Sequence, residues 1–476
     1  MRRSLLLLLL LPGSLFAADL DLGPGSDLRT LIGGVAPGDT VTLSGGEYVL
    51  DGSIVLRELA GTEASPVVIR AAEGATPVLR MDASATIFDI DVSSWVRISG
   101  LTLRGGDTGN PDDNYNHSGI SISEGSSNIV LENLDIGFLR NSAVGIGDAS
   151  AVTVRGCELH DLSNGNGVVA GCSDGNCWLA DGRIEGNWIH HLTESSGIWI
   201  HNAGQGNAIV DNVVHNVGSR GIRVGSTADG PENIVERNAV WTVGGNCLVA
   251  VGPSTMRNNV AFDCTGNGIR TDGDSASGFA DVRITHNTIW DTEDDGIEVR
   301  NWAGKTGCVL ANNAVANTNW YALQADEGHI DDGNLIVGNV VTGLVRGFDT
   351  LLGHYAGGYG EGDFEDAINW NFYPVDGSAL VDAGDSSGAA FVPSTDFNGA
   401  AREGDAPDVG AYERVEPSNP GWEVREGFKP TGPLVGDEVE VSGCDCENDG
   451  EGGGEATALL PLALIGFGLR RRRELD

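Results

Sequence analysis

A unit of 20 to 29 residues recurs along the middle of the chain, and it constrains the fold more than any other feature. Each unit begins with a strand such as "GIWIH", "GIRVG" or "GIEVR", and its second half carries an asparagine before a short apolar run. The asparagines are Asn187, Asn212, Asn238, Asn258, Asn287, Asn313 and Asn339, at spacings of 25, 26, 20, 29, 26 and 26 residues. A period of this length, built from short strands and turns, indicates a β-solenoid.

We expect the asparagine column to be structural. One unit has too few apolar residues to bury a face alone, whereas units stacked about 4.8 Å apart share one core. A buried asparagine is costly unless it is hydrogen-bonded, and stacked asparagines pass amide hydrogen bonds along the column. Leu101, Leu134 and Cys157 occupy the same place in earlier units, so the column should change from apolar to amide along the chain.

The repeats resemble the right-handed parallel β-helix of pectate-lyase-like proteins. The resemblance covers residues 40–345 and rests on the asparagine column and the Gly-Ile strand starts. It implies an all-β fold of roughly ten or more rungs, and the right-handedness comes from the family alone. Residues 19–94 are then expected to form an N-terminal cap with the first rungs, and residues 95–345 the repeats.

The first 18 residues have the features of a secretory signal peptide: a basic start, the apolar run "SLLLLLLL" and small residues before the expected cleavage site. We therefore expect an exported protein, in which disulfides are permitted. Cys172 and Cys177 are close enough to pair around a turn. The pairing of the other four body cysteines stays open; they are Cys157, Cys247, Cys264 and Cys308.

Residues 444–476 combine two cysteines, an acidic Gly-rich spacer, an apolar stretch and four arginines. The apolar stretch is shorter than the about 20 residues that span a bilayer comfortably, and arginine resists translocation. This order resembles the C-terminal sorting signal of myxobacterial surface proteins, which implies a sorting protease acting near Cys444 or Cys446. An ordinary membrane anchor is the alternative. Both place the protein at the cell surface or outer membrane, with release as a further outcome, and limit membrane contact to this signal.

Residues 346–413 contain "DAGD", "DFNGAAR" and "PDVGAYE". These motifs resemble a module that follows such helices in surface-anchored bacterial proteins, which implies display and brings no assigned chemistry. Residues 414–443 contain four prolines and are predicted to be a linker.

The chain carries 28 Lys and Arg residues against 68 Asp and Glu residues, a formal net charge of −40. Such a field repels nucleic acids and anionic polymers alike, so no nucleic-acid partner is expected. An anionic polysaccharide would need a local basic patch or a bridging cation. Lys305 and Lys429 are the only lysines, so arginine carries nearly all of the positive charge.

In the strand starts, the apolar residues should point inward and the residues between them outward, so that stacking creates two surface columns. The first column contains Trp199, Arg223, Val249, Arg270, Glu298 and Gln324. The second contains His201, Val251, Asp272, Arg300 and Asp326. Related lyases and hydrolases place their active groove on this face.

The charged members of these columns allow two interpretations. A uronate lyase needs a base and a positive charge beside the enolate. Arg270 or Arg300 could be the base with Glu298 in the catalytic set, while Asp272, Asp295 and Glu298 offer oxygen ligands to calcium. The alternative is a ladder of salt bridges that face only each other, worth about 0.2–1 kcal/mol per pair.

Other enzyme classes have weaker support. A glycoside hydrolase needs two suitably spaced carboxylates, and "RTDGDS" and "TEDDGIEVR" resemble the acidic parts of polygalacturonase-like enzymes. Neither Gly-His-Gly nor Arg-x-Lys is present. A lysine-dependent lyase would have to use Lys305, which is predicted to lie in a turn.

A further column lies three residues after the asparagines, and its members are His160, His190, His215, Trp241, Ala261 and Trp290. Its aromatic rings could stack on sugars, and its imidazoles could bind a transition metal. The alternative is an aromatic cover on a sheet face, under a loop.

Two classes of function therefore remain. A surface-displayed protein that binds extracellular polysaccharide or matrix is favoured, because the catalytic signatures are incomplete. A calcium-assisted polysaccharide lyase is the first alternative, and a glycoside hydrolase is the second.

Overall fold

A computed structural model describes most of the chain between the two predicted terminal signals. The described residues are 17–105, 117–172, 177–202, 204–227, 230–272, 280–388, 391–402 and 406–431. The predicted sorting signal and nearly all of the predicted signal peptide lie outside them. Within those ranges no helix is long and apolar enough to cross a membrane.

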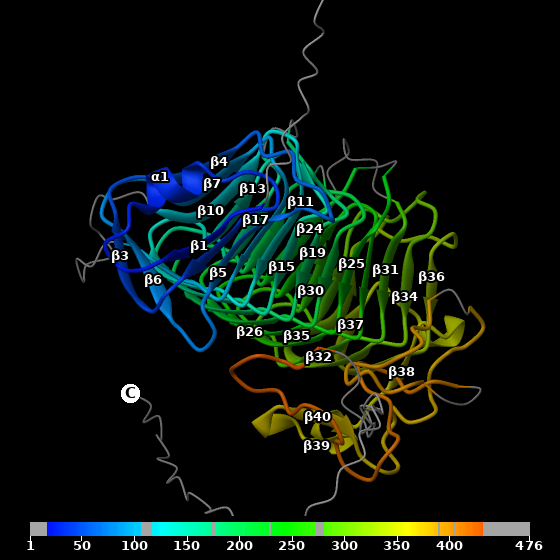
Figure 1. The fold of residues 1–476 in the computed structure, drawn as a ribbon. Coiled ribbons are helices and arrows are strands. Elements are labelled where there is room, and N and C mark those ends of the chain that lie inside the picture. The colour runs from blue at the N-terminus through cyan, green and yellow to red at the C-terminus, as the bar shows by residue number, and fades with distance from the viewer. Residues whose placement is uncertain are drawn as a thin grey trace, which may run out of the picture. The chain divides into compact units, whose positions relative to one another are not determined.

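The described chain winds through successive turns of parallel strands that stack along one axis (Figure 1). One wall is a 15-stranded sheet, which we call sheet A. Its main path runs through β1 (Asp19–Leu22), β2 (Thr40–Leu43), β5 (Val67–Ala71), β8 (Ser94–Ser99), β11 (Ser126–Glu132), β15 (Thr153–Arg155), β19 (Arg183–Glu185), β22 (Ala208–Val210), β25 (Asn233–Glu236), β28 (Ser254–Arg257), β31 (Val282–Thr285), β34 (Val309–Ala311) and β36 (Leu335–Val337), with β14 (Ala149–Ser150) and β18 (Leu179–Ala180) beside it.

The other walls form one 23-stranded sheet with two strand columns, which we call faces B1 and B2. Face B1 contains β4 (Ile54–Arg57), β7 (Thr86–Asp91), β10 (Ser118–Ser123), β13 (Val144–Ile146), β17 (Val168–Ala170), β21 (Ile198–Ile200), β24 (Ile222–Gly225), β27 (Leu248–Val251), β30 (Ile269–Thr271) and β33 (Ile297–Val299). Face B2 contains β3 (Gly46–Leu50), β6 (Pro77–Met81), β9 (Thr102–Arg104), β12 (Asp135–Leu139), β16 (Glu158–Leu162), β20 (Trp188–Leu192), β23 (Val213–Val217), β26 (Ala239–Val243), β29 (Val260–Cys264) and β32 (Thr288–Trp290). The long strands β35 (Ala314–Ala325) and β37 (Asn339–Arg346) run through both faces.

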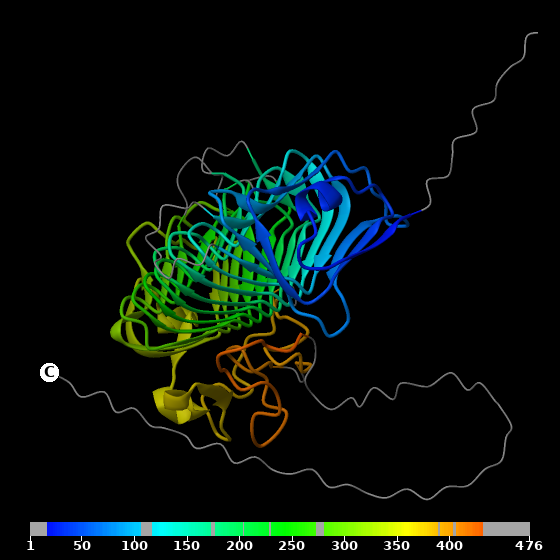
Figure 2. The ribbon, with the colours of Figure 1, turned by 60° about the vertical axis from the view of Figure 1, so that its left-hand side comes forward.

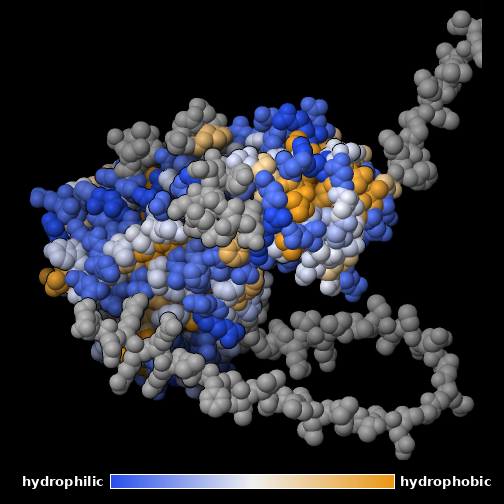
Figure 3. Space-filling view, turned by 90° about the vertical axis from the view of Figure 1, so that its left-hand side faces the viewer, coloured by the Kyte–Doolittle hydropathy of each residue, from blue (hydrophilic) through white to orange (hydrophobic). Residues whose placement is uncertain are grey.

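A short helix, α1 (Leu28–Gly33), packs on β4 at the N-terminal end. Its N-cap Asp27 accepts a hydrogen bond from Thr30 N, and Leu28 is buried, so the helix protects the first strands from pairing with another chain. Figure 3 shows that this end of the molecule is largely hydrophilic, with hydrophobic side chains gathered in one area. Val49 of β3 and Val55 of β4 are exposed hydrophobic residues of these first strands.

A ladder of buried asparagines joins the turns between sheet A and face B2. The Asn238 Oδ1 atom accepts Asn212 N at 2.9 Å and Asn212 Nδ2 at 3.0 Å, and the same Nδ2 donates to Ile184 O at 2.9 Å. This pattern links Asn187, Asn212, Asn238, Asn259, Asn287, Asn313 and Asn339. Leu101, Leu134 and Cys157 are buried before it, so the predicted change from apolar to amide is confirmed.

The prediction was one residue early at Asn258, because Asn259 is the ladder member. Asn258 has a φ of 53°, and its Nδ2 donates to Thr395 O at 2.6 Å. Each ladder asparagine follows a residue in the left-handed conformation, which asparagine tolerates well. In the Asn258-Asn259 pair, the first asparagine occupies the left-handed position and the second occupies the ladder position. We call the non-glycine members of the left-handed column the turn edge: Asp211, Arg237, Asn258, His286 and Asn312.

The disulfides agree with the part of the pairing that the sequence predicts. Cys172 and Cys177 are bonded, and Cys247, in the turn before β27, is bonded to Cys264 at the end of β29. Cys157 and Cys308 are free and buried. Burial raises the pKa of the Cys157 thiol to about 12 and that of the Cys308 thiol to about 11, so both act as small apolar residues.

Residues 346–431 form a C-terminal module beside face B2 (Figures 1 and 2). Its elements are η1 (Thr350–Leu352), β38 (Tyr355–Gly357), η2 (Gly360–Asp363), β39 (Phe364–Asp366), η3 (Ala367–Asn369) and β40 (Asn371–Pro374). The sequence motifs build its interior. Asp396 accepts hydrogen bonds from the backbone of Asn398, Ala400 and Glu413, while Glu413 pairs with buried Arg402 at 3.1 Å.

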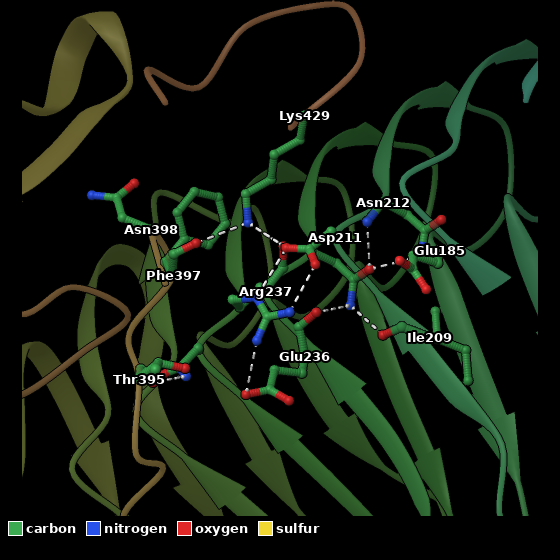
Figure 4. Close-up of polar contacts among 12 residues, drawn as sticks. Glu185, Ile209, Asp211, Asn212, Glu236, Arg237, Thr395, Phe397, Asn398 and Lys429 are labelled. Atoms are coloured by element: carbon green, nitrogen blue, oxygen red, sulfur yellow. Dashed lines mark hydrogen bonds and ion pairs between the residues drawn. The ribbon is translucent and has the colours of Figure 1, made fainter. Parts of the chain in front are cut away.

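Residues 414–431, predicted to belong to a linker, pack against the β-helix. Lys429 is 3% exposed, and its Nζ donates to Asp211 Oδ1 at 3.0 Å, to Arg237 O at 2.8 Å and to Phe397 O at 2.9 Å (Figure 4). Three acceptors match the three donors of an ammonium group. Burial lowers the pKa of Lys429 to about 8 against the effect of Asp211, so the side chain is charged at neutral pH.

Replacing Asn238 with alanine should lower the free energy of unfolding by about 3 kcal/mol, because buried partners of the lost amide stay unsatisfied. Chemical or thermal unfolding measures the change. Asn164→Ala, at an exposed position, is the matched control and should change stability little. Equal losses in both variants would mean that the ladder does not stabilise the fold.

Lys429→Met should destabilise the protein by about 3 kcal/mol, because it leaves two carbonyls and a carboxylate without their buried cation. The same change at Lys305, which has no ion pair among the described residues, should be nearly neutral. Thermal unfolding of both variants checks the difference. A Lys429 variant as stable as the Lys305 variant would contradict the prediction.

Candidate functional site

The outward column of face B1 brings several of the expected site residues onto adjacent rungs. The backbone register aligns Trp199 with Arg223 and then Arg223 with Val249, and it aligns Arg270 with Glu298 and then Gln324. Val249 and Val251 were expected at the surface but are buried. They separate an aromatic part of the column, at Trp199, from a charged part.

The charged part is a compact network around Glu298. The Glu298 Oε1 atom accepts Arg300 Nε at 2.6 Å, and its Oε2 accepts Asn267 Nδ2 at 2.8 Å. Arg270 Nε lies 3.6 Å from the same Oε2, and Arg270 Nη2 lies 3.6 Å from Asp272. Asp272, directly after β30, therefore pairs with Arg270 of the same rung and not with Arg300 of the next. Glu298 thus accepts hydrogen bonds from Arg300 and Asn267, whereas Arg270 contributes ion pairs and its buried Nε has no hydrogen-bond partner.

Asp295 belongs to a second polar ladder, in the turns that precede face B1. Asn267 Oδ1 accepts Asp295 N at 2.9 Å, and Asp295 Oδ1 accepts Tyr321 N at 3.3 Å, so the carboxyl occupies an amide position. With its amide nitrogen facing the carboxyl, Gln324 donates to Asp295 Oδ1 at 3.0 Å. Burial, with the neighbouring Asp294 carboxylate, raises the pKa of Asp295 to about 7.

The arrangement does not fit calcium. Among the described residues, no three or more His, Cys, Asp or Glu side chains are grouped to hold a metal ion. Both Glu298 oxygens and Asp295 Oδ1 accept hydrogen bonds from protein groups. Calcium also prefers six to eight oxygen ligands. No chemical step is therefore derived through this ion.

The aromatic part is a platform around the half-buried indole of Trp199. The ring of His201 stacks on it at 4.5 Å between centroids, and the guanidinium groups of Arg223 and Arg220 lie 5.4 Å and 5.8 Å from its centroid. Burial and Arg223 lower the pKa of His201, so its ring is neutral near pH 7. An aromatic face with fixed hydrogen-bonding groups around it can stack on a sugar ring.

Face B2 carries the histidine and tryptophan column. The register aligns His160, His190, His215, Trp241, Phe262 and Trp290, so Phe262 replaces the expected Ala261, in step with the shift at Asn259. Neighbouring rings stack at 5.4 Å from His160 to His190 and from His190 to His215. Apart from Trp290, the aligned rings are buried, so the column is not an open surface.

His160 and His190 are held by polar neighbours. The ring nitrogens of His160 lie 2.8 Å from Asp135 and 2.6 Å from Asp161. Against the effect of burial, these two carboxylates raise the pKa of His160. Burial and the adjacent imidazoles lower the pKa of His190 to about 3, so the stack carries at most a proton on His160 near neutral pH.

The C-terminal module covers the tryptophan half of the column. Trp241 is 1% exposed, and the Trp370 ring of η3's C-cap lies 5.4 Å from it and 5.3 Å from Phe262. Trp290 meets Phe364 and Phe372 at 5.8 Å and 6.1 Å. Trp241 therefore has no free ring face. This agrees with the alternative that the aromatic side chains cover a sheet face beneath another segment of the same chain.

Three contributors escaped the sequence prediction: Arg220, Asn267 and Asp135. Asn267 and Asp295 share their place before Gly-Ile, so the repeat contained the signal for a second polar column. Arg220 stands at the same place before Gly221. No local sequence pattern predicts the role of Asp135, because its contact with His160 joins two adjacent rungs.

Asp295→Asn should raise stability at pH 8.5 by about 2 kcal/mol and change it little at pH 4. Because the folded pKa of Asp295 is raised above its ordinary value of 3.8, its contribution is complete below pH 3.8 and is lost as pH rises through 7. An amide keeps the ladder bond without titrating. Unfolding curves across pH check this, with Asp332→Asn, at an exposed position away from Asp295, as control. A uniform shift at both pH values would contradict the assignment.

Comparison with known proteins agrees with this architecture. The family described as the right handed beta helix region matches residues 86–259 and 142–315. Pectate lyase Pel9A has a TM-score of 0.51 at 15% identity, covering 84% of this chain and 98% of that chain. The mannuronan C-5 epimerase AlgE6 A-module of Azotobacter vinelandii has a TM-score of 0.51 at 17% identity, covering 71% and 99%. No curated protein sequence gives a significant match. At these identities the likeness concerns the fold: the protein is a right-handed parallel β-helix with a C-terminal module packed on its flank.

Proposed function

We propose that the protein binds an extracellular polysaccharide on face B1, through the platform around Trp199. The observation that carries the proposal is the half-buried indole with His201 on one side and Arg223 beside it. Aromatic rings with neighbouring polar groups are suited to sugar rings. The two arginines near this ring, Arg220 and Arg223, supply local positive charge on a chain whose net charge is −40.

Binding is favoured over cleavage because the charged side chains of the column form ion pairs with one another. Arg300 and Arg270 both face Glu298, and a base or an electrophile that is already paired must break that pair before it acts on a sugar. The names of the two similar structures refer to pectate and mannuronan, which supports a carbohydrate ligand. A lyase that uses Arg270, Arg300 and Glu298, with calcium recruited by substrate, is the competing proposal.

The binding role fits display outside the cell. The N-terminal signal and the C-terminal Cys, apolar and arginine order support export and anchoring by a sorting protease. A rigid stack of rungs then presents face B1 to glycans of the matrix or of another cell. Localisation of the tagged protein, with and without residues 444–476, tests this part separately.

Trp199→Ala should weaken polysaccharide binding about tenfold, equivalent to about 1.4 kcal/mol of lost stacking. Calorimetry against a panel of uronic-acid and neutral polymers measures the change, and Trp178→Ala, a partly exposed tryptophan elsewhere, is the matched control. Equal affinity of the two variants would contradict the platform. Absence of binding across the panel would contradict the proposed function.

The same panel separates binding from catalysis. Ultraviolet absorbance from unsaturated products, with calcium or with chelator, reports β-elimination, and reducing ends without that absorbance report hydrolysis. Loss of either activity in Arg270→Ala and Arg300→Ala, with binding retained, would replace the binding proposal by an enzymatic one.

A further inference from the structure

The C-terminal module is held on the turn edge by hydrogen bonds to side chains in left-handed positions. Asn312 donates from Nδ2 to Asp385 O at 2.9 Å and accepts Asp385 N at 2.8 Å. Asn258 Oδ1 accepts Arg402 Nη2 at 2.8 Å, and its Nδ2 donates to Thr395 O. The interface is therefore a series of specific polar contacts along one corner of the β-helix.

His286 lies in the middle of this interface and is completely buried. Its Nδ1 is 3.1 Å from Asp408 O, and its Nε2 is 3.0 Å from Asn312 Nδ2. A carbonyl only accepts and an amide nitrogen only donates, so Nδ1 carries the proton and Nε2 accepts. The docked interface thus requires a neutral imidazole. A proton on Nε2 would point at the N–H group of Asn312.

The charged groups around His286 also disfavour a proton. Arg402 is the cation beside it, and Arg402 itself donates to Asp408 O and Gly410 O and pairs with Glu413. The Asp408 carboxylate is turned away and accepts backbone N–H groups of Asp382 and Arg414. Burial, and then Arg402, lower the pKa of His286 well below its ordinary value of 6.5.

We propose that the module and the turn edge form an acid-sensitive clasp, in which protonation of His286 releases the module and uncovers the aromatic column at Trp241 and Phe262. The rings under the module continue the buried stack of His160, His190 and His215, so release would expose the Trp241 and Phe262 end of this column on face B2. This inference is independent of the proposed polysaccharide binding on face B1.

The direction of the pH effect follows from linkage. Since the docked imidazole is neutral, docking is at full strength above pH 6.5 and weakens as pH falls below it, by up to tenfold per pH unit for one proton. The carboxyl groups of the interface either favour docking as pH falls or are protonated only at lower pH. Burial raises the pKa values of Asp396 and Asp408, so their protonation favours docking. Against burial, Lys429 and Arg237 lower the pKa of Asp211, which therefore protonates last.

A second neutral histidine lies at the rim of the module. His215 stacks on Trp241 at 4.6 Å, accepts Trp188 Nε1 at 2.9 Å, and has the Glu426 carboxylate nearby. Burial lowers its pKa, so acid would also loosen this rim. A variant of His215 must therefore accompany a variant of His286.

The test follows the full chain between pH 7.5 and pH 4.5. Hydrogen exchange with mass spectrometry, corrected for the intrinsic pH dependence, should show loss of protection in residues 378–431 while the sheet strands stay protected. Tryptophan emission should shift to the red at the same midpoint. Simultaneous loss of protection in module and sheets, or no loss in the module, would overturn the proposal.

His286→Asn assigns the proton, because asparagine already occupies the same left-handed position at Asn258 and Asn312 and bonds module carbonyls there. The midpoint should fall by at least one pH unit in this variant. His354→Asn, at a partly exposed position near the start of the module, should keep the wild-type midpoint, and His215→Asn should shift it less than His286→Asn. An unchanged midpoint in His286→Asn would overturn the proposal. If that variant does not fold at pH 7.5, the exchange pattern of the wild-type chain decides.

Discussion

The buried amide ladder is the interaction on which the rest of the structure depends. Each rung turns sharply from sheet A to face B2, and the turn leaves backbone N–H and carbonyl groups inside, away from water. A ladder asparagine satisfies them with one side chain, since its oxygen takes two donors from the rung before and its nitrogen serves a carbonyl. The same geometry forces the preceding residue into the left-handed conformation and turns its side chain outward.

That outward column gives the flank of the solenoid its chemical character. Asp211, Asn258, His286 and Asn312 each offer a different set of donors and acceptors, and the module matches them one by one with Lys429, Arg402, Asp408 and Asp385. The module's sequence motifs, which carry no catalytic pattern, are explained by this docking. Its aromatic side then covers the tryptophans of face B2, while face B1, with Trp199 and the Glu298 network, lies on a different column of the rungs.

Much of the β-helix was predictable because each rung repeats the same local sequence pattern. The strand starts, the buried Ile297 and Val299, and most ladder asparagines followed from period and alternation. Asn258 failed because two adjacent asparagines fit both the left-handed slot and the ladder slot, and the error moved Ala261 into the place of Phe262. The fold of residues 414–431 was not predictable, since prolines indicate an extended chain but not the surface against which it packs. The self-pairing of Arg270 and Glu298 followed from their adjacent rungs, whereas the amide role of Asp295 required the neighbouring turn to be seen.

The buried contact of Lys429 determines how the molecule would bear mechanical load. A pull on the chain beyond residue 431 reaches Lys429 before it reaches the last rung, because this side chain ties the chain to Asp211 and Arg237 in the middle of the stack. The force is then shared between the Lys429 contact and the covalent link to the last rung, so the terminal strands are less easily separated one after another. A solenoid held by its side rather than by its end resists unravelling until Lys429 and the other contacts of the module along the turn edge are broken.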